Sequence, residues 1–249
     1  MLNHLIIAQV SDTHINRLAE PNKNTGANPR DQFLEVIRIL AARPLDLLVL
    51  SGDLAALAGE IEAYIWLKQA LNTFPYPYIV MPGNHDDTAT MVSTFALPAS
   101  DYQQGMLYFQ RTVKGRRLLF LDTSSYQLPT VQLDWLRQQL VHDNEPVLLF
   151  IHHPPLLCGC RFMDSYYSLR NIDEVWPVLR ELAPIQHIFC GHYHAAKTVM
   201  RDGKCVHVTP STMMQIDPDT PHFAIAHTRP GWRIIEWHDS EVHTYVEFI

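Results

Sequence analysis

Five short apolar runs punctuate the chain, and each is followed by carboxylate, amide or imidazole side chains. The runs are rich in Leu, Ile and Val, a composition typical of strands that are buried on both faces of a parallel sheet. With the polar residues that follow, they are LIIAQVSDTH at 5–14, LLVLSGD at 47–53, YIVMPGNHD at 78–86, VLLFIHH at 147–153 and IQHIFCGHYH at 185–194. Because ligands of open α/β sheets bind at the carboxyl ends of the strands, the pattern predicts one cluster of these polar groups.

Helical patterns separate the first three runs. Residues 31–43 carry one apolar stripe before Arg43-Pro44 ends the segment, and its members are Phe33, Leu34, Ile37, Leu40 and Ala41. Residues 60–71 carry a second stripe with Ile61, Tyr64, Ile65 and Leu71. This alternation of strand and helix predicts parallel βαβ units.

The pattern changes after residue 86. Residues 87–104 and 158–171 show no regular period, whereas 132–140 and 172–182 have helical stripes. Paired runs predict hairpins at 106–113 with 116–121, around Lys114-Gly115, and at 198–201 with 205–209, around Asp202-Gly203. Further strands are predicted at 223–226, 232–237 and 242–248. Parallel units followed by an antiparallel half suit two sheets packed face to face with helices outside.

Length, charge and cysteine usage limit the alternatives. A chain of 249 residues that is 47% hydrophobic can bury a sizeable core, and we expect one domain over residues 1–249. The net charge of −7 argues against nucleic-acid and membrane-surface partners. No run approaches a membrane span, the N-terminal run is too short for a signal peptide, and four cysteines without framework spacing favour a reduced, cytoplasmic protein. The sequence gives no indication of oligomeric state.

The polar residues after the strands have the composition of a metal site. In an extended chain, Asp12 and His14 would point to the same side, and so would His192 and His194. The two oxygens of Asp53 can bridge two cations. The predicted ligands are Asp12, His14, Asp53, Asn84, His152, His192 and His194. They are too many for one ion, so we expect two divalent ions, and the mixed oxygen and nitrogen donors suit Fe, Mn or Zn. Cys158-Gly159-Cys160 is an alternative ligand pair.

Taken in order, the motifs D-x-H, G-D, G-N-H-D, H-H-P and G-H-x-H resemble the signature of the calcineurin-like metallophosphoesterase superfamily. The resemblance implies an α/β fold, a four-layer α-β-β-α sandwich of two mixed sheets flanked by helices, with two metals. By this similarity, the first metal is held by Asp12, His14, Asp53 and His194. The second is held by Asp53, Asn84, His152 and His192. The first histidine of H-H-P is the ligand in such proteins, which leaves His153 a supporting role.

Later segments narrow the resemblance to class III cyclic nucleotide phosphodiesterases, the bacterial 3′,5′-cyclic AMP phosphodiesterase group. They are Ser168 to Asn171, Thr209 to Thr212 and Pro230 to Arg233. The implied substrate is a small phosphodiester, 3′,5′-cyclic AMP or another cyclic nucleotide, which is hydrolysed to the 5′-nucleotide. The earlier motifs are shared with other diesterases, so a broader phosphodiesterase such as a glycerophosphodiesterase is the alternative. Pro230-Gly231 as a turn and Trp232 as a core residue are the simpler interpretations of those positions.

The cluster suggests a mechanism in which a metal-bridging hydroxide, held through Asp53, attacks phosphorus. Asn84, His85, His192 and His194 are the residues we expect near the substrate. His85 is placed to stabilise or protonate the departing 3′ oxygen, and Asp86 is expected to orient His85 or His14. A non-catalytic scaffold would be expected to lack ligands, and because all seven are present the sequence favours an enzyme.

Overall fold

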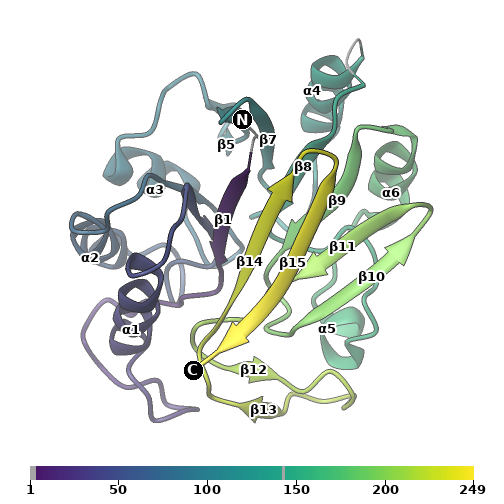
Figure 1. Cartoon of the computed structure of the whole chain (residues 1–249). Helices are drawn as coiled ribbons and strands as arrows, with labels where there is room; N and C mark the ends of the chain where they lie inside the picture. The colour runs from purple at the N-terminus through teal and green to yellow at the C-terminus, as the bar shows by residue number, and fades with distance from the viewer. Residues whose placement is uncertain (1–3, 142–143) are drawn as a thin grey trace.

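The computed structural model describes residues 4–141 and 144–249. Its first sheet has the strand order β15-β14-β1-β2-β3. The strands are β1 (Leu5–Val10), β2 (Leu47–Ser51), β3 (Tyr78–Met81), β14 (Gly231–His238) and β15 (Glu241–Phe248). The first three are parallel, and β14 pairs antiparallel with β1, with Ile7 opposite Ile235. The C-terminal hairpin therefore completes the sheet that the N-terminal strand begins (Figure 1).

The second sheet has the order β10-β11-β9-β8-β7-β6. Its strands are β6 (Phe109–Val113), β7 (Arg116–Leu121), β8 (Val147–Ile151), β9 (Ile185–Cys190), β10 (Lys197–Arg201) and β11 (Lys204–Val208). The four inner strands are parallel, and the two edge strands pair antiparallel with their neighbours. Two small ribbons pair β4 (Tyr102–Gln103) with β5 (Met106–Leu107), and β12 (Gln215–Ile216) with β13 (Ile225–His227).

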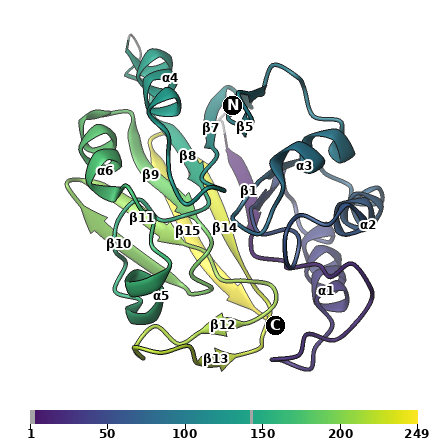
Figure 2. The same ribbon diagram turned by 180° about the vertical axis from the view of Figure 1, so that it is seen from behind.

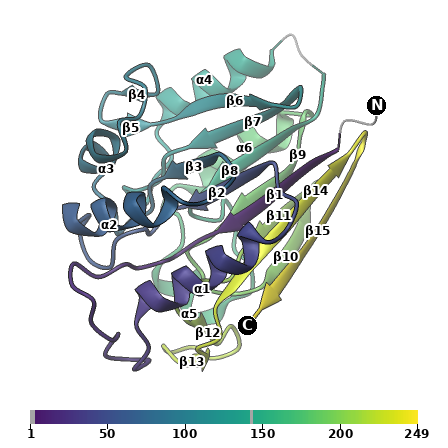
Figure 3. The same ribbon diagram turned by 60° about the vertical axis from the view of Figure 1, so that its left-hand side comes forward.

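Helices lie outside both sheets. On the side of the first sheet are α1 (Pro29–Ala41), α2 (Ile61–Leu71) and α3 (Thr88–Phe95). On the side of the second are α4 (Thr130–Leu140), α5 (Arg161–Tyr166) and α6 (Ile172–Glu181). Figures 1 and 2 show the two groups on opposite sides, and Figure 3 brings α1 and α2 forward. The expected four-layer α-β-β-α arrangement is confirmed.

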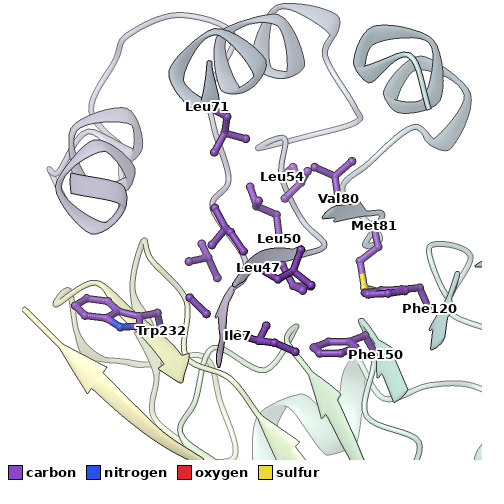
Figure 4. Packing of buried hydrophobic residues seen from close by; sticks show 14 of the residues in the cluster. Ile7, Leu47, Leu50, Leu54, Leu71, Val80, Met81, Phe120, Phe150 and Trp232 are labelled. Carbon is purple, nitrogen blue, oxygen red and sulfur yellow. The ribbon is translucent and has the colours of Figure 1, made fainter. Parts of the chain in front are cut away.

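The middle strands alternate between two cores. Leu118 and Phe120 of β7 belong to the cluster shared with the first sheet, whereas Leu119 and Leu121 belong to the cluster under α4 and α6. In the first cluster, the stacked rings of Phe109, Phe120, Phe150 and Phe189 cross four strands at centroid distances of 4.8, 5.0 and 5.3 Å. Figure 4 shows Phe120 and Phe150 close to Met81 and Ile7 of the first sheet. Such double burial explains why these strands lack a polar face.

Two helices lie where the sequence shows no period. Helix α3 occupies part of the 87–104 stretch, and the Asp87 side chain caps it by accepting a hydrogen bond from Thr90 N at 2.8 Å. Its residues are mostly small or β-branched, so only Met91 and Phe95 mark its buried stripe. Helix α5, six residues long, forms within the 158–171 segment. Neither helix was predicted, because no regular apolar period marks either one; α3 has the Asp87 cap, whereas α5 has no side-chain cap.

Some residues of the predicted apolar stripes are exposed rather than buried. Ile61 and Ile65 are 48% and 42% exposed, and Leu34 is 43% exposed. The buried positions of α2 include Ala63 and Leu67 instead. Ala63 is fully buried in the first core cluster, and period alone does not distinguish a buried Ala from a bulkier neighbour. Trp232, by contrast, is a core residue as expected, 2% exposed, and Gly231 begins β14 rather than lying in a turn.

No helix in the described part of the chain has the length and apolarity needed to cross a membrane.

Candidate metal centre and active site

The five predicted strand ends converge on one buried cluster. Each of β1, β2, β3, β8 and β9 stops just before its polar motif. One group consists of Asp12, His14 and His194, and another of Asp53, His152 and His192, with the candidate ligand atoms of each group within 4.8 Å of one another. All six residues are at most 7% exposed. The first sheet supplies the carboxylates and His14, and the second sheet supplies the other imidazoles.

The backbone at these motifs is left-handed rather than extended. Asp12 and His14 have φ of 54° and 44°, Asp53 has 52°, and His192 and His194 have 66° and 48°. The expectation that alternation in an extended chain would align each pair is therefore wrong, although the side chains do converge. Such conformations are unfavourable for residues other than glycine and persist where the surroundings impose them. Here Asp12 N and His14 N each donate a 3.0 Å hydrogen bond to the loop after β2.

Glycine is required beside two of the motifs because the strands approach closely. Gly52 has φ of 100°, and a Cβ there would collide with the ring of His152. A Cβ at Gly191 would collide with Ser11 Oγ. The loop after β9 is also tied to β1, because His192 N donates to both carboxylate oxygens of Asp12 at 3.1 and 3.0 Å. The two sheets can therefore meet at the cluster only with glycine at these positions.

Three imidazoles are oriented by backbone carbonyls. The ring contacts are His152 Nδ1 with Ser51 O at 2.8 Å, His192 Nε2 with Tyr167 O at 2.8 Å, and His194 Nδ1 with Met214 O at 3.0 Å. A carbonyl oxygen only accepts, so each of these nitrogens carries the proton and the neutral ring keeps a lone pair on its other nitrogen. This is the arrangement in which histidine binds a metal.

The remaining ring nitrogens face the carboxylates. His194 Nε2 lies 3.0 Å from His14 Nε2 and 3.3 Å from Asp12 Oδ1. His152 Nε2 lies 3.3 Å from Asp53 Oδ2, and His14 Nε2 lies 3.8 Å from the same oxygen. Asp53 therefore lies between the two groups. Within the described residues, the buried atoms Asn84 Oδ1, His152 Nε2 and His192 Nδ1 have no hydrogen-bond partner. Buried oxygen and nitrogen atoms without a hydrogen-bond partner can offer a lone pair to a bound cation.

The charges of the cluster also favour a cation. Burial works against ionisation of Asp12, but the His194 and His152 imidazoles outweigh it and lower the pKa of Asp12 to about 2. Burial lowers the pKa of His14 to about 3 and that of His192 to about 4. For His152, burial is outweighed by Asp53, which raises the pKa to about 9. The two carboxylates thus face the neutral imidazoles of His14 and His192, while the raised pKa of His152 shows that Asp53 already favours a positive charge beside it.

His85 lies at the edge of the cluster. Its backbone N–H donates to Asp53 Oδ1 at 2.8 Å, and its ring Nδ1 contacts Ala56 O at 3.0 Å. The ring packs edge-on against His14 with centroids 4.9 Å apart and lines the cavity above the site. Its ligand atom also lies within 4.8 Å of those of His14 and Asp53. The geometry thus permits a part in proton transfer or in metal binding.

Asp86 holds the backbone rather than the imidazoles. Its carboxylate accepts hydrogen bonds from Leu54 N, Ala55 N and Gly83 N at 2.9 to 3.1 Å and from Tyr64 Oη at 2.9 Å. The expected contact with His85 or His14 is replaced by these bonds. Asp86 therefore fixes the loops that carry Asp53 and Asn84.

His153, for which we expect a supporting role, belongs to none of the candidate ligand groups among the described residues. Its Nδ1 contacts Thr123 Oγ1 at 2.9 Å, and its ring lies 4.1 Å from that of His192 and 4.6 Å from that of Tyr126. Cys158 and Cys160, the alternative ligand pair, are buried thiols that belong to none of the ligand groups found among the described residues.

A cavity of about 800 Å³ opens above the cluster. The loop at residues 16–24 forms one wall. The rest of the lining includes an aromatic and thioether-rich part that comprises Tyr126, Phe162, Tyr167, Met213 and Phe223. These residues come from loops and from α5, and no periodic pattern identified them. Volume and lining are typical of a site for a small organic ligand.

The segments 168–171, 209–212 and 230–233, on which the resemblance to cyclic nucleotide phosphodiesterases rests, contact the residues around the site. Asn171 bonds both backbone groups of Leu128, and Arg170 stacks over Tyr126 at 5.0 Å. Ser211 Oγ donates to Asp12 O at 2.8 Å, and Arg233 Nε donates to Thr209 Oγ1 at 3.1 Å. These segments therefore support the cavity wall and the loop after β1 that carries Asp12.

The chain is similar to known sequences over most of its length. The family model described as calcineurin-like phosphoesterase matches residues 5–196. A protein of Fibrobacter succinogenes named probable cyclic nucleotide phosphodiesterase is 40% identical over 98% of this chain and 94% of its own length. The 3′,5′-cyclic adenosine monophosphate phosphodiesterase CpdA of Escherichia coli is 31% identical over 95% of this chain and 88% of its own length.

Solved structures share the fold at low identity. A dimetal phosphatase of Danio rerio superimposes with a TM-score of 0.68 at 14% identity, covering 96% of this chain and 98% of that one. The purple acid phosphatase PPD1 of yellow lupin superimposes with a TM-score of 0.66 at 12% identity, covering 98% of this chain and 53% of that one.

Proposed function

The chain belongs to the calcineurin-like phosphoesterase family, and on that premise we propose that it hydrolyses 3′,5′-cyclic AMP to 5′-AMP with two divalent metal ions. One observation carries the metal part of the proposal. Imidazoles oriented by backbone carbonyls present their free nitrogens to two carboxylates on the floor of a cavity. The names of the relatives support the substrate.

The donor set divides between two ions. One would be held by Asp12, His14, Asp53 and His194, and the other by Asp53, Asn84, His152 and His192. Asp53 is proposed as the shared residue because its Oδ2 lies 3.8 Å from His14 Nε2 and 3.3 Å from His152 Nε2, and so borders imidazoles of both groups. Oxygen and nitrogen donors together suit Fe, Mn or Zn. When bound, the ions supply an activated water and offset the negative charge of the phosphate.

His85 is proposed to deliver a proton to the departing 3′ oxygen. The ring keeps Nδ1–H on Ala56 O, so the cationic form offers Nε2–H towards the cavity. The hydrogen bond from its backbone to Asp53 fixes the residue beside the bridging carboxylate. Asn84, His192 and His194 border the same floor and complete the surface that faces the phosphate. Loss of a general acid costs about 100- to 10,000-fold in rate.

The cavity supports a nucleotide over a smaller diester. Phe162 and Phe223 have ring centroids 5.9 Å apart and border the cavity together with Met213. An aromatic and thioether wall stabilises a purine by stacking, whereas a glycerol group would leave it uncovered. We therefore place the base against this wall and the phosphate over the metal ligands.

The proposal is tested by hydrolysis of 3′,5′-cyclic AMP by protein reconstituted with Mn²⁺ or Fe²⁺. Chromatography would resolve the 5′ and 3′ nucleotides, and bis(p-nitrophenyl) phosphate would be assayed beside them. We expect 5′-AMP, with the activity abolished in Asp53→Ala. Activity on the artificial diester alone would refute the cyclic nucleotide substrate and favour a broader phosphodiesterase. No activity on either compound, with metal bound, would refute the catalytic proposal itself.

The role of His85 is tested by His85→Ala. We expect kcat to fall about 100-fold or more while two metal ions per chain remain after dialysis, measured by atomic emission. A leaving group that needs no protonation, as in bis(p-nitrophenyl) phosphate, should lose less rate. Loss of one metal ion would instead assign His85 to the ligand set with His14 and Asp53.

We further propose that residues 1–249 act as one domain, because the C-terminal hairpin pairs with β1 and both sheets contribute to one core cluster. The free thiols of Cys158, Cys160, Cys190 and Cys205 support a cytoplasmic location. Cell fractionation would check the location.

A further inference from the structure

A second set of metal-type side chains lies on the second sheet, away from the strand ends that carry the active site. It consists of His187 on β9 and Cys205 and His207 on β11, with the ligand atoms within 4.8 Å of one another. The sequence pattern did not single it out. The ligand-bearing motifs of the active site lie beyond Cys190, where β9 ends, whereas His187 lies within β9 itself.

Strand register brings the three side chains to one face. Cys205 is the direct partner of His187 in the parallel pairing of β11 with β9. His207 follows Cys205 by two residues, so it points to the same side. Neighbouring strands lie about 4.8 Å apart, which is close enough for side chains of adjacent residues to share one ion.

The rings are already oriented as ligands. His207 Nδ1 contacts Thr198 Oγ1 at 3.1 Å, and because the hydroxyl can accept the Nδ1 proton, the Nε2 lone pair can accept from His187 Nδ1–H, a hydrogen bond that a bound ion would replace. His207 Nε2 lies 3.0 Å from His187 Nδ1. Two nitrogens on a tetrahedral zinc ion, each bonded at about 2.0–2.1 Å, are separated by about 3.3 Å. The rings need to part by only a few tenths of an ångström to admit such an ion.

The surroundings hold the rings in place and keep His207 neutral. The His207 ring stacks on Phe189 and on His187 at centroid distances of 4.8 and 5.4 Å. Burial, with Arg233 and His187 nearby, lowers the pKa of His207 to about 3. The guanidinium of Arg233, itself 3% exposed, disfavours added positive charge. A thiolate at Cys205 would offset part of that repulsion, so the site suits ions with a strong affinity for sulfur.

The cluster is reachable from solvent. His187 and Cys205 are half-buried, and the neighbouring edge strand β10 exposes Thr198 and Met200. An ion can therefore enter along this edge.

We propose that His187, Cys205 and His207 bind one thiophilic d¹⁰ transition-metal ion, such as Zn²⁺, separately from the active-site metals. The thiol proton of Cys205 passes to solvent as the metal–sulfur bond forms. The bound ion cross-links β9 to β11 beside the exposed edge of the second sheet.

Cobalt substitution separates this site from the active site. The proposed active-site ligands contain no sulfur, so a thiolate-to-cobalt charge-transfer band can come only from a cysteine. Metal-free protein titrated with Co²⁺ should develop the near-ultraviolet band in the wild type and in Cys160→Ser, and the band should be absent in Cys205→Ser. The band should persist in Asp53→Ala, so that a failed proposal for the active site does not affect the result. Absence of the band in the wild type, or its persistence in Cys205→Ser, would overturn the proposal.

Thiol protection provides an independent measurement. Cys205 is the half-buried cysteine, whereas Cys158, Cys160 and Cys190 are buried. With free Zn²⁺ at about 100 times Kd, alkylation of Cys205 followed by peptide mass spectrometry should slow about 100-fold. An unchanged rate would contradict the proposal. Equal thermal unfolding of metal-free Cys205→Ser and wild type would show that the variant folds, and its phosphodiesterase activity should match that of the wild type.

Discussion

Replacing Asp86 by Ala removes one carboxylate that supports two loops of the metal site. The carboxylate accepts hydrogen bonds from the backbone N–H groups of Leu54, Ala55 and Gly83 and from the hydroxyl of Tyr64. Leu54 follows Asp53 directly, and Gly83 precedes Asn84. The variant therefore leaves four donors without an acceptor and frees the backbone on either side of the proposed ligands.

The magnitude follows from the number of donors. A buried donor that loses its partner costs about 1–3 kcal/mol. The site borders a cavity that water can enter, so we use the lower limit of about 1 kcal/mol for each of the four donors. Asp86→Ala should therefore lower the free energy of unfolding by about 4 kcal/mol. Metal affinity should fall about 10- to 100-fold, as for other residues that orient ligands.

Urea denaturation of metal-free protein would measure the stability, and metal titration would measure the affinity. Asp87→Ala is the matched control, since it removes a neighbouring carboxylate that caps α3 and accepts from Thr90 N. Loss of such a cap costs about 1 kcal/mol, with little effect on metal binding. If the two variants were equally stable and bound metal equally well, Asp86 would not be the support of these loops.

Three further outcomes are expected. Gly191→Ala should destabilise the protein by about 1–3 kcal/mol because the added Cβ collides with Ser11 Oγ. Urea denaturation should show that Ser11→Gly restores part of this stability. If Gly191→Ala lost no stability, the close approach of the two loops would be contradicted. Phe223→Ala should raise KM for cyclic AMP about tenfold through lost stacking, with kcat unchanged, while exposed Leu157→Ala, outside the cavity, should have no effect. Removal of metal by chelation should cost about 2.7 kcal/mol relative to protein with free metal at 100 times Kd, and a denaturation midpoint insensitive to chelator would argue against bound metal.

The strands and their polar ends could be predicted because both are local properties. A strand buried on two faces needs a continuous apolar run, and each of the five runs ended where the structure ends the strand. The helix at Thr88–Phe95 escaped prediction because its stripe has only two large residues and its cap is a single side-chain contact. Ile61 and Ile65 were predicted to be buried but are exposed, because the helical period does not determine which side of the helix is buried.

The sequence alone predicted the candidate donor residues and their order along the chain, because residue type and strand ends are encoded locally. Only the tertiary structure decided how those donors meet. Left-handed backbone at Asp12 and His194, and glycine where the sheets touch, depend on contacts between segments about 180 residues apart. The same holds for the pairing of β14 with β1, for the cavity wall and for the His187, Cys205 and His207 cluster. These features arise from close packing between distant segments, and the physical reason they escape a local pattern is that each segment has its conformation imposed by the others.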